Sequence, residues 1–135
     1  MRDLAWLFLV LMILATGCGG SGKLQTKGRV LKGGQPFTVP EGEYVRLIFV
    51  PVFESGNPHE TFVAEYNRKD GSFKVAGKDL PGMPPGKYKI AVEHLRKRAD
   101  LLKGAFDGDR TPFICEIHNS SDEVTIDLLT KKLVQ

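Results

Sequence analysis

The chain has 135 residues, of which 41% are hydrophobic and 26% charged, and its formal net charge at pH 7 is +3. This length fits one domain, and the composition is that of a globular protein, which excludes a disordered chain. The charge is weak and no nucleic-acid-binding module is recognisable, so we expect no nucleic-acid partner.

The N-terminus is strongly hydrophobic. Residues 4–15 form an unbroken apolar run of 12 residues, "LAWLFLVLMILA", which Arg2 and the free amino group precede. A helix that crosses a membrane needs about 20 apolar residues, so this run is too short to span one. Its length is typical of the hydrophobic region of a secretory signal peptide, and we expect residues 1–17 to be a signal peptide helix.

The stretch "ATGC", which ends the hydrophobic run, resembles the bacterial lipobox, although Ala15 stands where that motif usually has leucine. The resemblance implies that the Cys18 sulfur receives diacylglycerol, that cleavage follows Gly17, and that the new amino group of Cys18 is acylated. Acyl chains contribute about 0.8 kcal/mol for each buried methylene, so two chains would anchor the protein firmly. The alternative is an ordinary signal peptide cut at the same place, which leaves Cys18 free.

Residues 18–23, "CGGSGK", are rich in Gly and Ser and predict a lipidated flexible tether. About five such residues reach an r.m.s. distance of ~12 Å, so the folded part would stay close to the lipid surface. Gly19 follows Cys18, where the inner-membrane retention signal has aspartate. We therefore expect a membrane-anchored, extracytoplasmic protein, in the outer membrane rather than the inner one.

Beyond the tether the chain alternates apolar and polar residues with the period of β-strands. Turn signals separate the runs, among them Gly33-Gly34, Gly56-Asn57-Pro58 and Lys69-Asp70-Gly71. About seven short strands at this spacing predict an all-β sandwich over residues 24–131, of the transthyretin-like or immunoglobulin-like kind. The expected strands cover residues 26–32, 44–52, 61–66, 72–75, 88–94, 113–117 and 123–128.

The same alternation predicts which side chains face the core. The segment 44–52, "YVRLIFVPV", is apolar on both faces, as expected for a central strand that is covered on both sides. In the last three strands the predicted inward residues are Tyr88, Ile90, Val92, Phe113, Cys115, Ile117, Val124, Ile126 and Leu128. Cys115 is flanked by apolar residues at strand spacing, so we interpret it as a small buried hydrophobe and not as a reactive thiol.

The segment "HLRKRADLLKGAF" breaks the strand pattern. Leu95, Ala99, Leu102 and Phe106 have the spacing of one helical face, and both a short helix and a long irregular connection are compatible with it. The segment and the residues after it hold the densest basic cluster of the chain: Arg96, Lys97, Arg98, Lys103 and Arg110. The cluster fits either a solvated loop or a contact with anionic lipid headgroups or an acidic partner.

The motifs "GRVLKGGQP", "VRLIFVP", "RKDGSFKV" and "LPGMPPGKYKIAV", in this order, resemble the carboxypeptidase regulatory-like domains, a transthyretin-like β-sandwich group. The resemblance covers residues 26–92 and the strand at 123–129. It departs at "FTVPEGE", residues 37–43, and at residues 95–112, which both lengthen loops. It implies a non-catalytic, extracytoplasmic module that serves attachment or assembly.

No catalytic or metal site is expected. The chain ends "KKLVQ", without the Tyr-Arg-Gly-Ser tail of the transthyretin-like hydrolases, and no Ser/His/Asp order or G-x-S-x-G motif occurs. His59, His94 and His118 lack the spacing of metal ligands, and the alternative is that His59-Glu60 and His94, near Glu93, converge across strands. We expect no cofactor.

The sequence therefore predicts a non-catalytic lipoprotein of the cell envelope, a binding or assembly module for an envelope protein or a glycan. A glycan site would need exposed aromatic rings, and Tyr44, Tyr66 and Tyr88 remain after the signal peptide, the last on a core-facing register. The alternative function is an oligomeric small-ligand carrier or hydrolase of the transthyretin type. A third possibility is a lipid-surface binder that uses the basic cluster.

Overall fold

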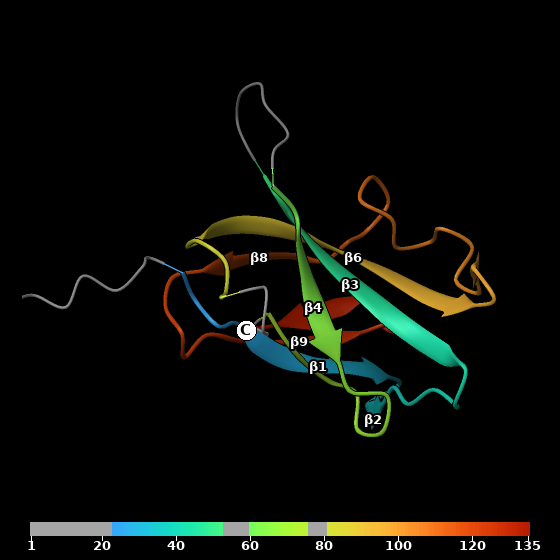
Figure 1. The fold of residues 1–135 in the computed structure, drawn as a ribbon. Helices are drawn as coiled ribbons and strands as arrows, with labels where there is room; N and C mark the ends of the chain where they lie inside the picture. Colours follow the sequence, from blue (N-terminus) through green and yellow to red (C-terminus); the bar gives the residue numbers. More distant parts are fainter. Residues whose placement is uncertain (1–22, 53–59, 76–80) are drawn as a thin grey trace, which may run out of the picture.

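The computed structural model describes residues 23–52, 60–75 and 81–135, so the predicted signal peptide, Cys18 and most of the tether lie outside the described residues. These residues contain ten β-strands and no helix, which confirms the all-β class (Figure 1). The strands are β1 (Lys27–Lys32), β2 (Gln35–Pro36), β3 (Glu43–Pro51), β4 (Phe62–Tyr66), β5 (Ser72–Lys74), β6 (Gly86–Arg96), β7 (Ala99–Asp100), β8 (Ile114–Ile117), β9 (Glu123–Asp127) and β10 (Lys132–Val134).

The strands form one curled, mixed sheet. Its order is β10-β9-β1-β5-β4-β3-β6-β7, with β2 paired to β1 and β8 paired to β6. All pairs are antiparallel except β1 with β9, which run parallel. The sheet passes from one layer to the other at β4, where residues 62–64 pair with β3 but Glu65 and Tyr66 pair with β5. The two layers of the sandwich are therefore hydrogen-bonded to each other through one strand.

Seven of the ten strands match the predicted ones. The three that were not predicted, β2, β7 and β10, have only two or three residues each, too few to show a period of two. β10 extends the sheet beyond residue 131, where the sequence placed the end of the domain.

The core lies between the two layers and includes the residues that the alternation predicted, together with Phe37, Val39, Met83 and Phe106 from the connections. The nine predicted inward residues of β6, β8, β9 and their flanks are all buried. β3 differs from its prediction: Val45, Leu47 and Phe49 are buried, but Ile48 and Val50 on its other face are only half-buried. The reason is that the sheet covers only the concave side of β3, so its outer face borders solvent.

Cys115 is 2% exposed and forms no disulfide. Its burial raises the pKa of the thiol to about 12, so the group stays protonated at neutral pH. This confirms the interpretation of Cys115 as a small buried hydrophobe.

Two of the predicted turns are present and depend on glycine. Gly33 and Gly34 both have positive φ, 64° and 81°, between β1 and β2. Gly71 has a φ of 74° between β4 and β5, and a Cβ there would stand 2.8 Å from the Val30 carbonyl oxygen. The turn at Gly56-Asn57-Pro58 lies outside the described residues.

The segment 95–112 is neither a helix nor an irregular loop throughout. β6 continues to Arg96, a tight turn follows, β7 pairs back on β6, and a series of turns leads to β8. The four residues at helical spacing belong to different elements: Leu95 is in β6, Ala99 is in β7, and Leu102 and Phe106 pack against the core from the turns. The helical spacing of these residues therefore does not mark a helix, because they lie in separate elements.

Candidate binding tip

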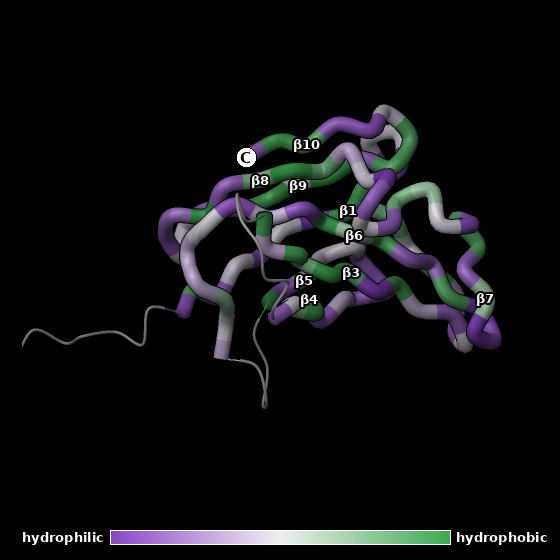
Figure 2. The backbone as a smooth tube through the Cα atoms, turned by 90° about the horizontal axis from the view of Figure 1, so that it is seen from above, coloured by the Kyte–Doolittle hydropathy of each residue, from purple (hydrophilic) through white to green (hydrophobic). Residues whose placement is uncertain are grey.

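The described chain begins at one end of the sandwich. Leu24 forms a β-bridge with Met83, with N–H···O distances of 2.7 and 3.0 Å, and Met83 precedes the start of β6 by three residues. The predicted tether at residues 18–23 therefore enters the domain beside the first residue of β6. Figure 2, seen from above, has this entry and the label of β7 at opposite ends of the molecule.

β6 spans the length of the domain. It has 11 residues, which at about 3.3 Å per residue make a strand on the order of 30 Å long. The turn after Arg96 is therefore about that far from Leu24, at the other end of β6 (Figure 1). We call residues 95–110, which follow from this point, the tip.

The tip begins with a tight hairpin. Leu95 pairs with Asp100 and Arg96 with Ala99, which leaves a two-residue loop of Lys97 and Arg98. Both loop residues have positive φ, 48° and 69°, as in a type I′ turn, where Asn-Gly is the favoured pair. Long basic side chains at these positions strain the backbone.

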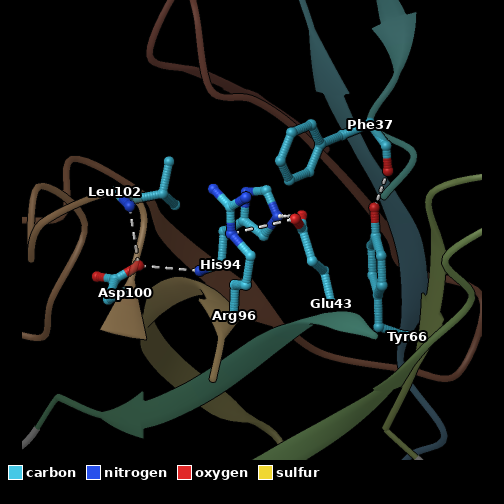
Figure 3. Close-up of polar contacts among 7 residues, drawn as sticks. All are labelled: Phe37, Glu43, Tyr66, His94, Arg96, Asp100 and Leu102. Atoms are coloured by element: carbon cyan, nitrogen blue, oxygen red, sulfur yellow. Dashed lines mark hydrogen bonds and ion pairs between the residues drawn. The ribbon is translucent and has the colours of Figure 1, made fainter. Parts of the chain in front are cut away.

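A carboxylate orders the chain after the hairpin. Asp100 accepts hydrogen bonds from the backbone amides of Leu102 and His94, both at 3.0 Å (Figure 3), and from the amide of Gly104 at 2.9 Å. Burial acts to raise the pKa of Asp100, but the three amides outweigh it and the pKa is lowered. The turns around Lys103, which itself has a φ of 54°, are therefore held in one conformation.

Apolar packing fixes the rest of the tip against the sheet. The Phe106 ring stacks on Phe113, with ring centroids 5.4 Å apart, and the Phe106 carbonyl accepts a bond from the Val92 amide at 2.9 Å. The buried Thr111 hydroxyl donates to the Ile90 carbonyl at 2.6 Å. The turns at the tip thus lie along β6, and the tip is packed and hydrogen-bonded onto the rest of the domain.

A polar cluster closes the sandwich below the hairpin. Glu43, at the start of β3, contacts His94 Nε2 at 2.6 Å and Arg96 Nε at 3.4 Å (Figure 3). The His94 and Glu43 side chains are 15% and 11% exposed, and the Phe37 ring packs edge-on against His94 with centroids 5.4 Å apart. The contact of His94 with Glu43, between side chains with little exposure, ties β3 to the end of β6.

The five predicted basic residues gather at the tip, but their charges are not equivalent. Arg96 contacts Glu43, and Arg110 Nε lies 3.8 Å from Asp107. Arg110 also lies beside Gly104, since a Cβ added there would be 3.8 Å from Nη1. Within residues 23–52, 60–75 and 81–135, Lys97, Arg98 and Lys103 form no ion pair. The same three residues have positive φ.

Sequence reasoning missed the supporting residues Glu43 and Asp100. A local signal existed for Asp100, because an aspartate whose carboxylate reaches the amide two residues on is typical of an Asx turn. No local signal existed for Glu43, which is 51 residues from His94. That contact depends on the register of β3 against β6.

The metal alternative, in which His59-Glu60 and His94 near Glu93 converge, stays a prediction. His94 and Glu93 are neighbours on one strand and face opposite sides, and Glu93 pairs with Arg46 instead. His118 lies 3.7 Å from Glu116 on an exposed strand end, and His59 lies outside the described residues. In the described part of the chain no three His, Cys, Asp or Glu side chains converge as metal ligands.

The described residues contain no helix of the length and apolar character needed to cross a membrane. Comparison of the chain with protein-family models, with curated proteins and with solved structures found no match. The resemblances to a lipobox and to the carboxypeptidase regulatory-like domains therefore stay predictions from the motifs.

Proposed function

We propose that the protein is a non-catalytic, extracytoplasmic lipoprotein that is anchored through Cys18 and binds an acidic partner in the cell envelope with its tip. The observation that carries this proposal is the position of Lys97, Arg98 and Lys103. These three cations have no ion-pair partner among the described residues and lie about 30 Å from the point where the tether enters.

This position favours a partner other than the anchoring membrane. The tether reaches an r.m.s. distance of only ~12 Å, so the entry end of the domain would stay next to the lipid headgroups. The opposite end of β6 can then extend about 30 Å beyond them. The basic cluster is therefore better suited to an acidic protein or glycan across the envelope than to the headgroups of its own bilayer.

The backbone of the tip supports a binding role. A non-glycine residue in the left-handed region costs on the order of 1 kcal/mol, and here two such residues are adjacent. Asn-Gly at residues 97 and 98 would form the same turn with less strain. A ligand that contacts the charges of Lys97 and Arg98 would explain why basic residues stand at these strained positions.

Site-specific photo-crosslinking of the full-length protein in its native cells tests the proposal. A photoreactive residue replaces exposed Ala99, between the cations of the tip, and a control replaces exposed Ser120, which lines one surface hollow with Lys23 at the entry end. We expect position 99, and not position 120, to give a discrete protein or glycan adduct that is lost in Lys97→Gln/Arg98→Gln. The same adducts from both positions, or lipid adducts alone from position 99, would contradict it.

A further inference from the structure

A second polar surface lies outside the tip, where β3 and β4 separate. The two strands pair only from Leu47 with Ala64 to Phe49 with Phe62, so the first residues of β3 have no partner in β4. A groove of about 820 Å³ opens there and continues over the outer faces of β5, β1 and β9. The tip contributes no residue to it.

The groove carries more positive than negative charge. Five basic side chains line it: Lys27, Arg29, Arg68, Lys69 and Lys74. Three carboxylates also line it: Glu43, Glu65 and Glu123. Such a surface attracts an anion, but a densely acidic ligand would also meet the three glutamates.

Two lysines lie side by side in the groove. Lys27 and Lys74 stand directly opposite each other in the antiparallel pair of β1 and β5, and like charges in this position repel. Glu123 and Glu65 are their partners on the neighbouring strands. Even so, neither lysine is in an ion pair within the described parts of the chain. The two ammonium groups are thus available to an anion.

Aromatic and neutral polar groups complete the groove. Tyr44 is 52% exposed at its rim, and the hydroxyl of half-buried Tyr66 donates to the Phe37 carbonyl. Burial, and to a lesser extent the charge of Asp70, raise the pKa of Tyr66, so this bond is kept. Asn67, Ser72 and Thr125 add donors and acceptors.

We infer that this groove binds an acidic saccharide chain, with Lys27, Arg29 and Lys74 contacting its carboxylate or sulfate groups and the Tyr44 ring packing against a sugar face. A saccharide combines few negative charges with many hydroxyls, and those hydroxyls can donate to exposed Glu65 and Glu123, which would repel a polyacidic peptide. Rings such as that of tyrosine present an apolar face and a polar edge, which suits a sugar. The inference does not depend on the proposed function of the tip.

Binding of the full-length protein, purified in detergent micelles, to immobilised polygalacturonate, hyaluronan and chondroitin sulfate tests this inference. We expect at least one polymer to bind, and Lys27→Gln/Lys74→Gln and Tyr44→Ala each to weaken it by about tenfold or more, the size expected when charged or stacked contacts are removed. Methyl-esterified polygalacturonate, which lacks the carboxylates, serves as the neutral control for the first polymer.

The tip variant Lys97→Gln/Arg98→Gln is the matched control and is expected to bind the saccharide as the wild type does. Thermal unfolding controls for folding, and Lys27→Gln/Lys74→Gln should unfold close to the wild type, because it removes one like-charge pair together with two opposite-charge pairs across the strands. The inference is overturned if no polymer binds, if the groove variants bind like the wild type, or if polyglutamate competes equally through the same residues. The crosslinking result at position 99 is independent of all these outcomes.

Discussion

Asp127 connects two turns that are far apart in the sequence. Its carboxylate accepts backbone hydrogen bonds from Thr130 and Leu129 in the turn after β9, and from Gly33 and Gly34 in the turn between β1 and β2. The amide of Thr130 and these other amides hold the pKa of Asp127 at about 2, against the opposing effect of desolvation. One side chain therefore joins the β1–β2 hairpin to the parallel strand β9.

The low pKa makes a pH prediction. A carboxyl group whose pKa is lower in the folded state stabilises the fold above its unfolded pKa, near 4, and this contribution is lost as the pH falls to about 2. We expect Asp127→Asn to unfold at a lower urea concentration at pH 7 and to show a weaker loss between pH 4 and pH 2. Asp109→Asn, in the tip, is the control and should follow the wild type. Parallel pH profiles for wild type and Asp127→Asn would contradict the prediction.

Thr26 carries a buried hydroxyl group without a hydrogen-bond partner among the described residues. The residue is 0% exposed. Its backbone carbonyl accepts a bond from Val75, which a substitution of the side chain would keep. An unsatisfied buried polar group lowers stability.

Replacement of Thr26 by valine keeps the shape and removes the hydroxyl. We expect Thr26→Val to raise the free energy of unfolding by about 1 kcal/mol, measured by urea denaturation. Thr125→Val, half-exposed on β9, is the control and should change stability less. A Thr26→Val variant less stable than the wild type would show that the hydroxyl has a partner that stabilises the fold.

At the scale of elements, the β6–β7 hairpin combines strain with charge. Its two loop residues have positive φ, and the only other described non-glycine residues with positive φ are Lys103 and Lys131. All four are basic, but Lys131 lies in the turn between β9 and β10, outside the tip. Lys131 is thus a natural control that separates strain from binding.

This pairing leads to opposite expectations for stability and binding. Lys97→Asn/Arg98→Gly should raise the free energy of unfolding by about 1–2 kcal/mol, because Asn and Gly adopt positive φ with less strain. The same variant should lose the crosslink from position 99. Lys131→Gly should also gain stability, by up to about 1 kcal/mol, but keep the crosslink. If Lys97→Asn/Arg98→Gly still gave the full yield of the crosslink from position 99, the two cations would not be needed for binding, and this prediction would be wrong.

At the scale of the whole molecule, Leu24, where the described chain begins, and the tip lie at opposite ends of one strand. β6 runs from the entry of the tether to the hairpin, and the curled sheet holds it in the middle of its layer, between β3 on one side and β7 and β8 on the other. The length of β6 therefore sets the distance between Leu24 and the tip that we propose binds a partner. Contact at the tip should weaken as salt screens its exposed charges.

Counting thiols tests the anchor. Cys115 is the only cysteine besides Cys18, and its burial and raised pKa should prevent alkylation in the folded protein. After denaturation, we expect protein from native membranes to take up one alkyl group, because the Cys18 sulfur carries the lipid. Cys18→Ser should move the protein to the soluble fraction. Two alkyl groups per chain, or a membrane-bound Cys18→Ser, would contradict lipidation.

Much of the sandwich could be predicted from local patterns. Strict alternation in residues 123–128 correctly placed Val124, Ile126 and Leu128 in the core, because one face of that strand is buried and the other meets solvent. Turn glycines at residues 33, 34 and 71 were correctly placed because their positive φ is a local requirement. The failures were β3, whose outer face lacks the expected cover, and the short strands β2, β7 and β10, which were not predicted.

The sequence by itself determined the all-β class, the core faces of the strands, the inert character of Cys115 and the membership of the basic cluster, since each depends on residues close together in the chain. Only the tertiary structure decided that β4 joins the two layers, that Glu43 meets His94 and Arg96, and that Lys97, Arg98 and Lys103 are the cations without ion pairs in the described part. These features depend on the register between strands that are up to 51 residues apart in the sequence. Burial of the whole core sets that register, so it cannot be predicted from the residue pattern of any one segment.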